Sequence, residues 1–177
     1  DAAIYDGSAH MMNLLMALRQ SGGMPEARGQ GLLDGPHWSR TYACACGGHV
    51  SVQCLEPQFY EEFLRLMGLE ADESFQRQYD KALWPELTGR LAAIFKTRSR
   101  DDWAALFLGT DACAAPVLSP DEAARHEMNG ARSTWAKVNG VLQAAPAPRF
   151  EGQGGWEPVE PPARGADTAA ILKELED

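Results

Sequence analysis

One carboxylate in this sequence lies where it could take part in proton chemistry. Glu56 follows an alternating apolar segment typical of a β-strand and precedes Pro57. Proline suits the first turn of a helix, because its missing N–H has no partner there. The positive end of that helix could simply stabilise the acid. Alternatively, apolar neighbours such as Leu55 and Phe59 could hold it as a site carboxylate; spacing alone favours the helix-end role.

Cysteines and histidines are the other residues that could do chemistry. Cys44, Cys46 and Cys54, with His49 nearby, could form a zinc site, but C-x-C-x7-C is not a usual zinc spacing. We therefore expect no metal, and we interpret the cysteines as small core residues, with Cys44 and Cys46 on one strand face. Cysteines without a need for disulfides indicate a reducing, cytoplasmic compartment. We interpret all four histidines as surface or packing residues: His10, His37, His49 and His126.

The composition excludes several classes of protein. The chain has 177 residues, 45% of them apolar and 23% charged, which is ordinary for a globular protein. A formal net charge of −9 repels phosphate backbones, so we expect no nucleic-acid partner. The longest apolar stretch, Met11–Leu18, is too short to span a bilayer, so we expect no membrane partner. The opening Asp1-Ala2-Ala3 has no Met and no signal-peptide pattern, which predicts a fragment of a longer protein.

Apolar spacing and turn residues predict the elements of the first third of the chain. Residues 4–20 form a helical pattern that is apolar almost all round, so the helix should be buried. A glycine-rich segment, 24–36, is long for a loop and is therefore a linker or a functional loop. Gly47-Gly48 predicts a two-residue hairpin turn between strands at 39–46 and 49–55.

The remainder of the chain is predicted to be mainly helical. A short extended segment is expected within 109–118, and a proline-rich extended strap over 144–165. The central part, about 37–135, can therefore form its own α+β core of a hairpin and helices. Helices are predicted at 57–68, 73–79, 85–95, 99–107, 119–130 and 167–175.

Several sequence blocks match those of one known protein family. The blocks are R-G-Q-x-L-L-D-G at 28–35, R-T-Y at 40–42, L-E-P-Q-F-Y at 55–60, G-T-D-A-C at 109–113, P-V-L at 116–118, and weaker matches at 1–7 and 165–168. In these blocks the chain resembles the α-methylacyl-CoA racemases of the family III CoA-transferase (CaiB/BaiF-type) group. They occur in the expected order along almost the whole chain, and L-E-P-Q-F-Y is the most specific of them.

The resemblance implies an α/β fold in which this chain supplies only the C-terminal part. Residues 37–135 would be the small domain, 24–36 an outgoing linker and 136–177 a return strap with the last helix. Residues 1–23 would be a helix of a Rossmann-like large domain. The family forms an interlocked homodimer, which is therefore expected of the parent protein.

The resemblance also implies a role for Glu56. Racemising an acyl-CoA thioester needs one base on each face of the α-carbon, and the family uses a His and an Asp that precede this chain. Glu56 corresponds to the family's Glu that pairs with that His, so it would be a supporting catalytic residue rather than a proton carrier. We expect the isolated chain to be inactive, since neither proton carrier matches a residue here.

Three functions remain open at this stage. The first is part of a 2-methylacyl-CoA racemase, with acyl-CoA as substrate and no separate cofactor, because coenzyme A belongs to the substrate. The second is part of a family III CoA-transferase, although such enzymes carry a glycine-rich loop and lack this Glu, whereas the chain has Glu56 and no glycine run longer than two. The third is a non-catalytic binding protein. No cofactor-binding residue is identified.

Overall fold

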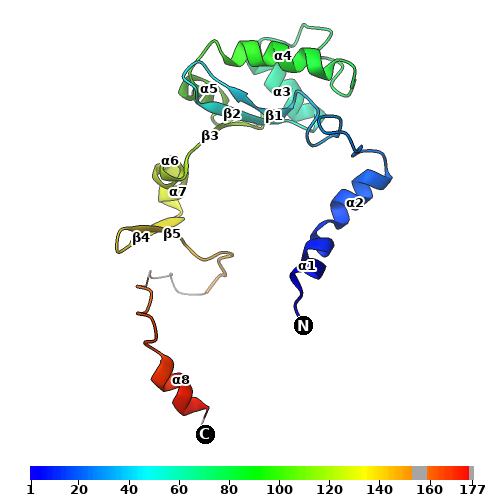
Figure 1. Cartoon of the computed structure of the whole chain (residues 1–177). Helices are drawn as coiled ribbons and strands as arrows, with labels where there is room; N and C mark the ends of the chain where they lie inside the picture. The colour runs from blue at the N-terminus through cyan, green and yellow to red at the C-terminus, as the bar shows by residue number, and fades with distance from the viewer. Residues whose placement is uncertain (153–158, 176–177) are drawn as a thin grey trace. The chain divides into compact units, whose positions relative to one another are not determined.

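The computed structural model describes residues 1–152 and 159–175, which divide into two compact units, Asp1–Val117 and Leu118–Asp177 (Figure 1). The division falls inside the predicted small domain, 37–135, whose boundaries stay a prediction. The first unit contains α1 (Ile4–Met11), α2 (Asn13–Gln20), β1 (Ser39–Ala43), β2 (His49–Gln53), α3 (Pro57–Met67), α4 (Trp84–Phe95), α5 (Arg100–Phe107) and β3 (Ala114–Val117).

A small antiparallel sheet forms the floor of the first unit. Its order is β1-β2-β3, with Ser39 opposite Gln53 at one end of the hairpin and Ala43 opposite His49 at the other. Val50 and Val52 alternate with more exposed residues on β2 and are completely buried. Helices α3, α4 and α5 lie on the same side of the sheet (Figure 1). The predicted mixed α/β small domain is therefore confirmed.

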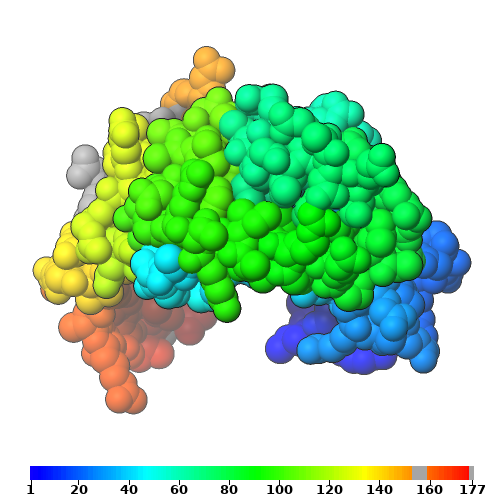
Figure 2. Space-filling view, turned by 90° about the horizontal axis from the view of Figure 1, so that it is seen from above, coloured from blue at the N-terminus to red at the C-terminus, as the bar shows by residue number. Residues whose placement is uncertain are grey.

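Aromatic rings fill the space between the sheet and the helices. The Tyr42 ring on β1 stacks on Phe95 of α4 with centroids 4.9 Å apart, and Phe95 in turn packs against Trp103 at 5.1 Å. Phe63 of α3 stacks on Phe107 of α5 at 6.0 Å. Seen from above, these helices form one continuous surface over that core (Figure 2). Burial of rings this large is the main stabilising term available to so small a unit.

Two local predictions in the first unit are wrong. The hairpin connection is not a two-residue turn but runs from Cys44 to Gly48, where the Cys44 N–H donates to the Gly48 carbonyl at 2.8 Å. Because β1 ends at Ala43, strand parity does not extend to the cysteines, and Cys44 is buried whereas Cys46 is exposed. The predicted helix at 73–79 is instead a series of turns, beginning at Asp72, whose carboxylate accepts from the Ser74 N–H.

The N-terminal segment also differs from the prediction. It forms two helices, α1 and α2, that meet at Met12, rather than one helix over 4–20. Its apolar side chains are exposed within this chain, Ile4 at 89% and Met11 at 83%, so the predicted burial is not observed here. In the part of the chain that the structure describes, no helix is long and apolar enough to cross a membrane.

The second unit is a short series of helices and one hairpin. It contains α6 (Pro120–Arg125), α7 (Glu127–Ala131), β4 (Trp135–Val138), β5 (Val141–Ala144) and α8 (Thr168–Glu174). The predicted helix at 119–130 is broken at His126, whose backbone is extended. The hairpin was not predicted, although Asn139-Gly140, with φ of 49° and 81°, is the residue pair that such a turn favours. Of the predicted strap, residues 153–158 lie outside the described residues.

The 24–36 segment is ordered by its own side chains and glycines. The Asp34 carboxylate accepts from the main-chain N–H groups of Gly29 at 2.7 Å and Gly31 at 3.0 Å. These bonds, that of Gly29 above all, lower the pKa of Asp34. Gly35 is buried against the same turn, where a Cβ atom would meet the carbonyl oxygens of Gly29 and Gly31 at 2.7 and 2.8 Å and the Trp84 ring at 3.0 Å. The segment is therefore packed against the start of α4.

This packing predicts opposite effects for two glycine substitutions. Gly35→Ala should destabilise the protein by about 1–3 kcal/mol, because two backbone oxygens and a buried ring would have to move. Gly89→Ala, in the interior of α4 with nothing within 4 Å of its Cβ position, should stabilise it by about 0.5–1 kcal/mol. Urea denaturation of both variants measures the difference; equal stability of the two would contradict the tight contact at Gly35.

Candidate functional site

Glu56 lies at the junction that the sequence predicts, between the end of β2 and the first residue of α3. It is the N-cap residue of α3, with φ −75° and ψ 141°, and its carbonyl accepts from the N–H groups of Phe59 and Tyr60 at 3.1 and 3.0 Å. Its side chain makes no capping hydrogen bond and is exposed. The helix end can stabilise the charge through its field, but no N–H donor occupies the carboxylate.

Two side chains hold the residues just before Glu56 through three hydrogen bonds. The buried Gln78 amide donates to the carbonyls of Cys54 at 3.1 Å and Leu55 at 3.0 Å. The Tyr79 hydroxyl also donates to the Leu55 carbonyl, at 2.8 Å. Since each hydrogen bond contributes on the order of 1 kcal/mol, this set holds the chain firmly where it turns from β2 into α3. Gln78 and Tyr79 therefore position the Glu56 backbone.

Two tryptophans hold Gln78 itself. The indole N–H groups of Trp38 and Trp84 both donate to the Gln78 carbonyl, at 3.1 and 2.9 Å. Both rings are almost completely buried, and their centroids lie 6.4 Å apart in an edge-on arrangement. The Glu56 junction is thus connected through Gln78 to residues at the start of β1 and of α4.

The Tyr60 side chain anchors the first turn of α3 in the core. Its hydroxyl donates to the Phe75 carbonyl at 2.9 Å and lies 2.7 Å from His37 Nε2, which must then be the donor in that pair. His37 Nδ1 is buried without a partner among the described residues. Burial lowers the pKa of His37 to about 4. His37 is therefore a neutral core residue, as expected of a packing histidine.

The Glu56 carboxylate affects the ionisation of the Cys113 thiol. Burial and then the nearby carboxylates of Glu56 and Asp111 raise the pKa of the Cys113 thiol. Its backbone has φ 47°, a left-handed conformation, and its carbonyl accepts from the Gln53 N–H at 2.9 Å. The G-T-D-A-C block therefore brings a neutral thiol close to the Glu56 carboxylate at the exposed end of β2.

The other candidate residues lie elsewhere. Cys44 and Cys54 are buried, as core cysteines should be, whereas Cys46 and Cys113 are exposed, which differs from the predicted core positions.

The histidines other than His37 lie at the surface or at a helix end. His10 and His49 are exposed, and His126 caps α7 through Nδ1, which accepts from the Met128 N–H. Within residues 1–152 and 159–175, no three His, Cys, Asp or Glu side chains are grouped to hold a metal ion.

The sequence reasoning missed the residues that position Glu56. Gln78 and Tyr79 lie in the stretch that was predicted to be a helix, where neither spacing nor composition indicates which residues face the β2 end. Cys113 was interpreted only as a core residue. The polar residues of Asp72–Asp80 are compatible with turns that lie over the core, but they do not indicate which carbonyls the segment contacts.

The fold and site define the class of protein as a mixed α/β small domain with an acidic strand–helix junction. The sequence profile of CoA-transferase family III matches residues 1–168, and the chain belongs to that family. It is 33% identical to mouse α-methylacyl-CoA racemase over 181 residues, and 34% identical to the human protein over 137. These alignments cover 98% and 76% of this chain but 46% and 35% of the relatives, so the chain spans about half the length of the mouse protein or less.

Solved structures show the same fold at lower identity. A Mycobacterium tuberculosis protein, Rv3272, matches with a TM-score of 0.68 and 15% identity over 97% of this chain and 45% of its own. A CaiB/BaiF family protein from Brucella suis matches with a TM-score of 0.66 and 21% identity over 98% of this chain and 47% of its own. At such identities the likeness concerns the fold alone.

The buried His37 predicts a pH dependence of stability. Its pKa is about 4 in the folded protein and 6.5 when unfolded, so the unfolded state binds more protons in that window. The free energy of unfolding should therefore fall by up to about 3 kcal/mol as the pH drops from 6.5 to 4, and should not change through His37 above pH 6.5. Urea denaturation at several pH values measures this loss.

Matched histidine variants assign the loss to His37. His37→Gln should be less stable at pH 7 yet show a flatter profile between pH 6.5 and 4, because the titrating group is gone. His49→Gln, at an exposed position on β2, should retain the profile of the unaltered protein. A profile that His37→Gln leaves unchanged would mean that other groups cause the acid destabilisation.

Proposed function

We propose that this chain is the C-terminal part of a 2-methylacyl-CoA racemase, an enzyme that inverts the α-carbon of an acyl-CoA thioester. The position of Glu56 carries the proposal: it lies within L-E-P-Q-F-Y, at the start of α3, with its carboxylate exposed and unused by the helix. The racemase names of the mouse and human relatives support the same reaction.

The proposed reaction moves one proton. A base on one face of the α-carbon removes the α-proton, the electron pair moves into the thioester as an enolate, and an acid on the other face returns a proton to the same carbon. The family resemblance assigns these roles to a His and an Asp outside this chain. Glu56 would accept a hydrogen bond from that His, which fixes its tautomer and raises its basicity.

The chain's own contribution is to hold the backbone that carries this carboxylate. Gln78 and Tyr79 fix the Leu55 carbonyl, and Tyr60 fixes the following helical turn, so the Glu56 backbone has firm supports on both sides. The carboxylate itself is exposed in this chain, and we propose that the remainder of the enzyme covers it. Because the backbone is already fixed, only the side-chain rotamers of Glu56 lose entropy when the carboxylate meets its partner.

The remaining parts of the proposal concern the parent protein. We propose a cytoplasmic, interlocked homodimer in which residues 1–23 and 136–177 belong to a Rossmann-like large domain. Coenzyme A enters as part of the substrate, with no separate cofactor. We also propose that the isolated chain does not catalyse the reaction, since both proton carriers would lie outside it.

The reaction class can be tested by isotope exchange. The full-length protein, incubated with a 2-methylacyl-CoA in heavy water, should incorporate deuterium at the α-carbon and convert either epimer into the mixture of both. The same incubation with an added acceptor carboxylate should form no new acyl-CoA. Transfer of coenzyme A to the acceptor without α-exchange would instead establish a CoA-transferase. If the protein catalysed neither reaction, the result would favour a binding protein.

The role of Glu56 can be tested separately. Glu56→Gln should slow exchange by at least about tenfold, because the carboxylate that orients the catalytic His is lost, and should leave the unfolding transition unchanged. Glu61→Gln, on the exposed surface of the same helix, is the matched control and should exchange at the normal rate. Equal rates in the two variants would remove Glu56 from the site.

A further inference from the structure

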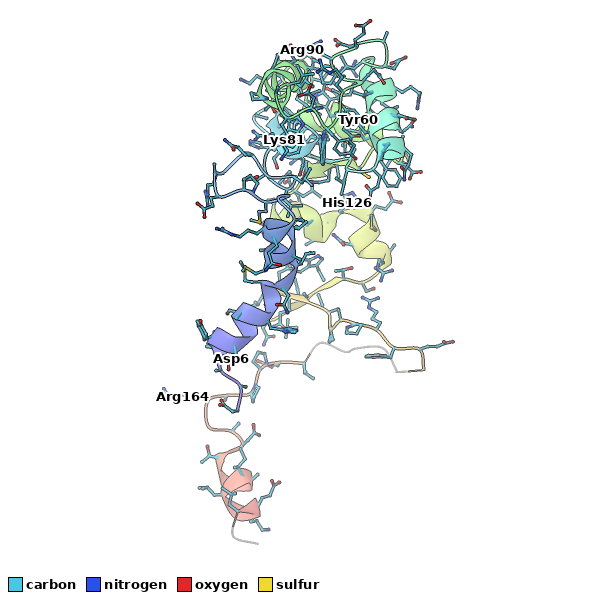
Figure 3. The ribbon with its side chains drawn as sticks, turned by 90° about the vertical axis from the view of Figure 1, so that its right-hand side faces the viewer. Asp6, Tyr60, Lys81, Arg90, His126 and Arg164 are labelled. Atoms are coloured by element: carbon cyan, nitrogen blue, oxygen red, sulfur yellow. The ribbon has the colours of Figure 1, made fainter. Side chains whose placement is uncertain are left out.

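A cavity of about 620 Å³ lies between the 22–35 segment and the start of α4. Its volume is in the range of sites that bind small molecules. Arg40 of β1, Lys81, and Trp84, Pro85 and Thr88 of α4 line it. Lys81 lies on the side of the unit that the 22–35 segment approaches (Figure 3).

The charged side chains that line this cavity are all cationic. Arg40 and Lys81 line it together with no Asp or Glu, and neither forms an ion pair within 4 Å with the described residues. Of the nearby carboxylates, Asp34 accepts two main-chain N–H groups and also interacts with the Arg40 charge, which contributes to its lowered pKa; Glu86 faces Arg90 at 3.9 Å. The positive charge of the cavity is therefore only partly compensated by the protein.

The Arg40 guanidinium has unused hydrogen-bonding capacity. Its Nη2 donates to the carbonyls of Asp34 at 3.0 Å and Gly35 at 3.4 Å, whereas its Nε is buried without a partner among the described residues. Thr88 Oγ1 is also buried without a partner of hydrogen-bonding geometry among the described residues, although it lies close enough to the Tyr42 hydroxyl to oppose the rise that burial causes in the pKa of Tyr42. An unpaired guanidinium N–H beside a cavity favours an oxyanion, which guanidinium binds through charge-assisted bonds.

Two other positive features border the same cavity. Lys81 Nζ lies 5.8 Å from the centre of the Trp84 ring, which keeps the ammonium group at the cavity wall. Helix α4 begins at Trp84 without a side-chain cap, so the positive end of a 12-residue helix also borders the cavity. Pro85, which is exposed, adds an apolar surface beside these charges, whereas the nearly buried Trp84 ring adds little.

We propose that this cavity binds a small organic anion. Its carboxylate or phosphate group would contact Arg40 and Lys81, and its apolar part would lie mainly against the exposed ring of Pro85. Because Nε is shielded from solvent, full engagement of the guanidinium requires a small rotation of the Arg40 side chain toward the ligand. The proposal does not depend on the reaction that the protein catalyses.

Titration with charged and neutral probes tests the proposal. Benzoate and inorganic phosphate should bind the full-length protein in calorimetric titrations, and benzamide, the neutral isostere of benzoate, should bind at least about tenfold more weakly. Equal binding of benzoate and benzamide would overturn the proposal, because the charge of the ligand would then not matter. Absence of binding by both anions would overturn it as well.

Variants locate the binding in this cavity. Arg40→Lys keeps the charge but removes the planar fork, and should weaken benzoate binding about tenfold. Lys81→Gln, at an exposed side chain whose loss should not unfold the protein, should weaken it about threefold. Lys96→Gln, at the opposite end of α4, is the matched control and should bind normally. Binding that neither Arg40→Lys nor Lys81→Gln weakens would place the anion elsewhere and contradict the proposal.

Competition identifies the source of the anion. If coenzyme A displaces benzoate and dephospho-coenzyme A does not, the cavity accepts the 3′-phosphate of the acyl-CoA substrate; if both displace it, the cavity accepts the diphosphate that the two compounds share. If neither displaces it, the cavity accepts a separate organic anion. All of these results presuppose the benzoate site, and the exchange experiment on Glu56 is unaffected by any of them, so the two proposals can fail independently.

Discussion

Two main-chain carbonyl groups at the end of β2 constrain much of the first unit. The ladder between β1 and β2 ends at Gln53, so the carbonyls of Cys54 and Leu55 need other donors. The Gln78 amide and the Tyr79 hydroxyl supply them. Without these donors, unpaired carbonyls would remain beside the core and the chain could leave the sheet in several directions.

The same constraint connects the core to the candidate site. Gln78 is held by the indoles of Trp38 and Trp84, so the segment that positions Glu56 rests on two buried rings of the core. On the other side, Tyr60 joins the first turn of α3 to His37 and Phe75. A supporting carboxylate needs such rigidity, because a small displacement would break its contact with a catalytic partner.

Trp84 also connects this arrangement with the cationic cavity. One part of the ring donates to the Gln78 carbonyl, while another borders the cavity and packs close to Gly35. The 24–36 segment therefore does more than join two elements, since its glycines let it approach α4 closely. Asp34 orders the segment with its carboxylate and contributes its carbonyl to Arg40. The glycine-rich composition of this segment is typical of a linker, but the folded segment forms one wall of the cavity.

Residue patterns alone determined the elements with strong local signals. The hairpin strands, α3 after Pro57, α5 after its Ser99 capping box and the junction at Glu56 all lie where periodicity and capping place them, because these depend on neighbouring residues. The family followed from the sequence blocks. The turns at Asp72–Asp80 and the break at His126 did not follow from the sequence, because the helix propensity of these residues is neither strong nor clearly weak. Only the tertiary structure decided that Gln78 supports the end of β2 and that Arg40 and Lys81 share a cavity, because both depend on contacts between residues distant in the chain.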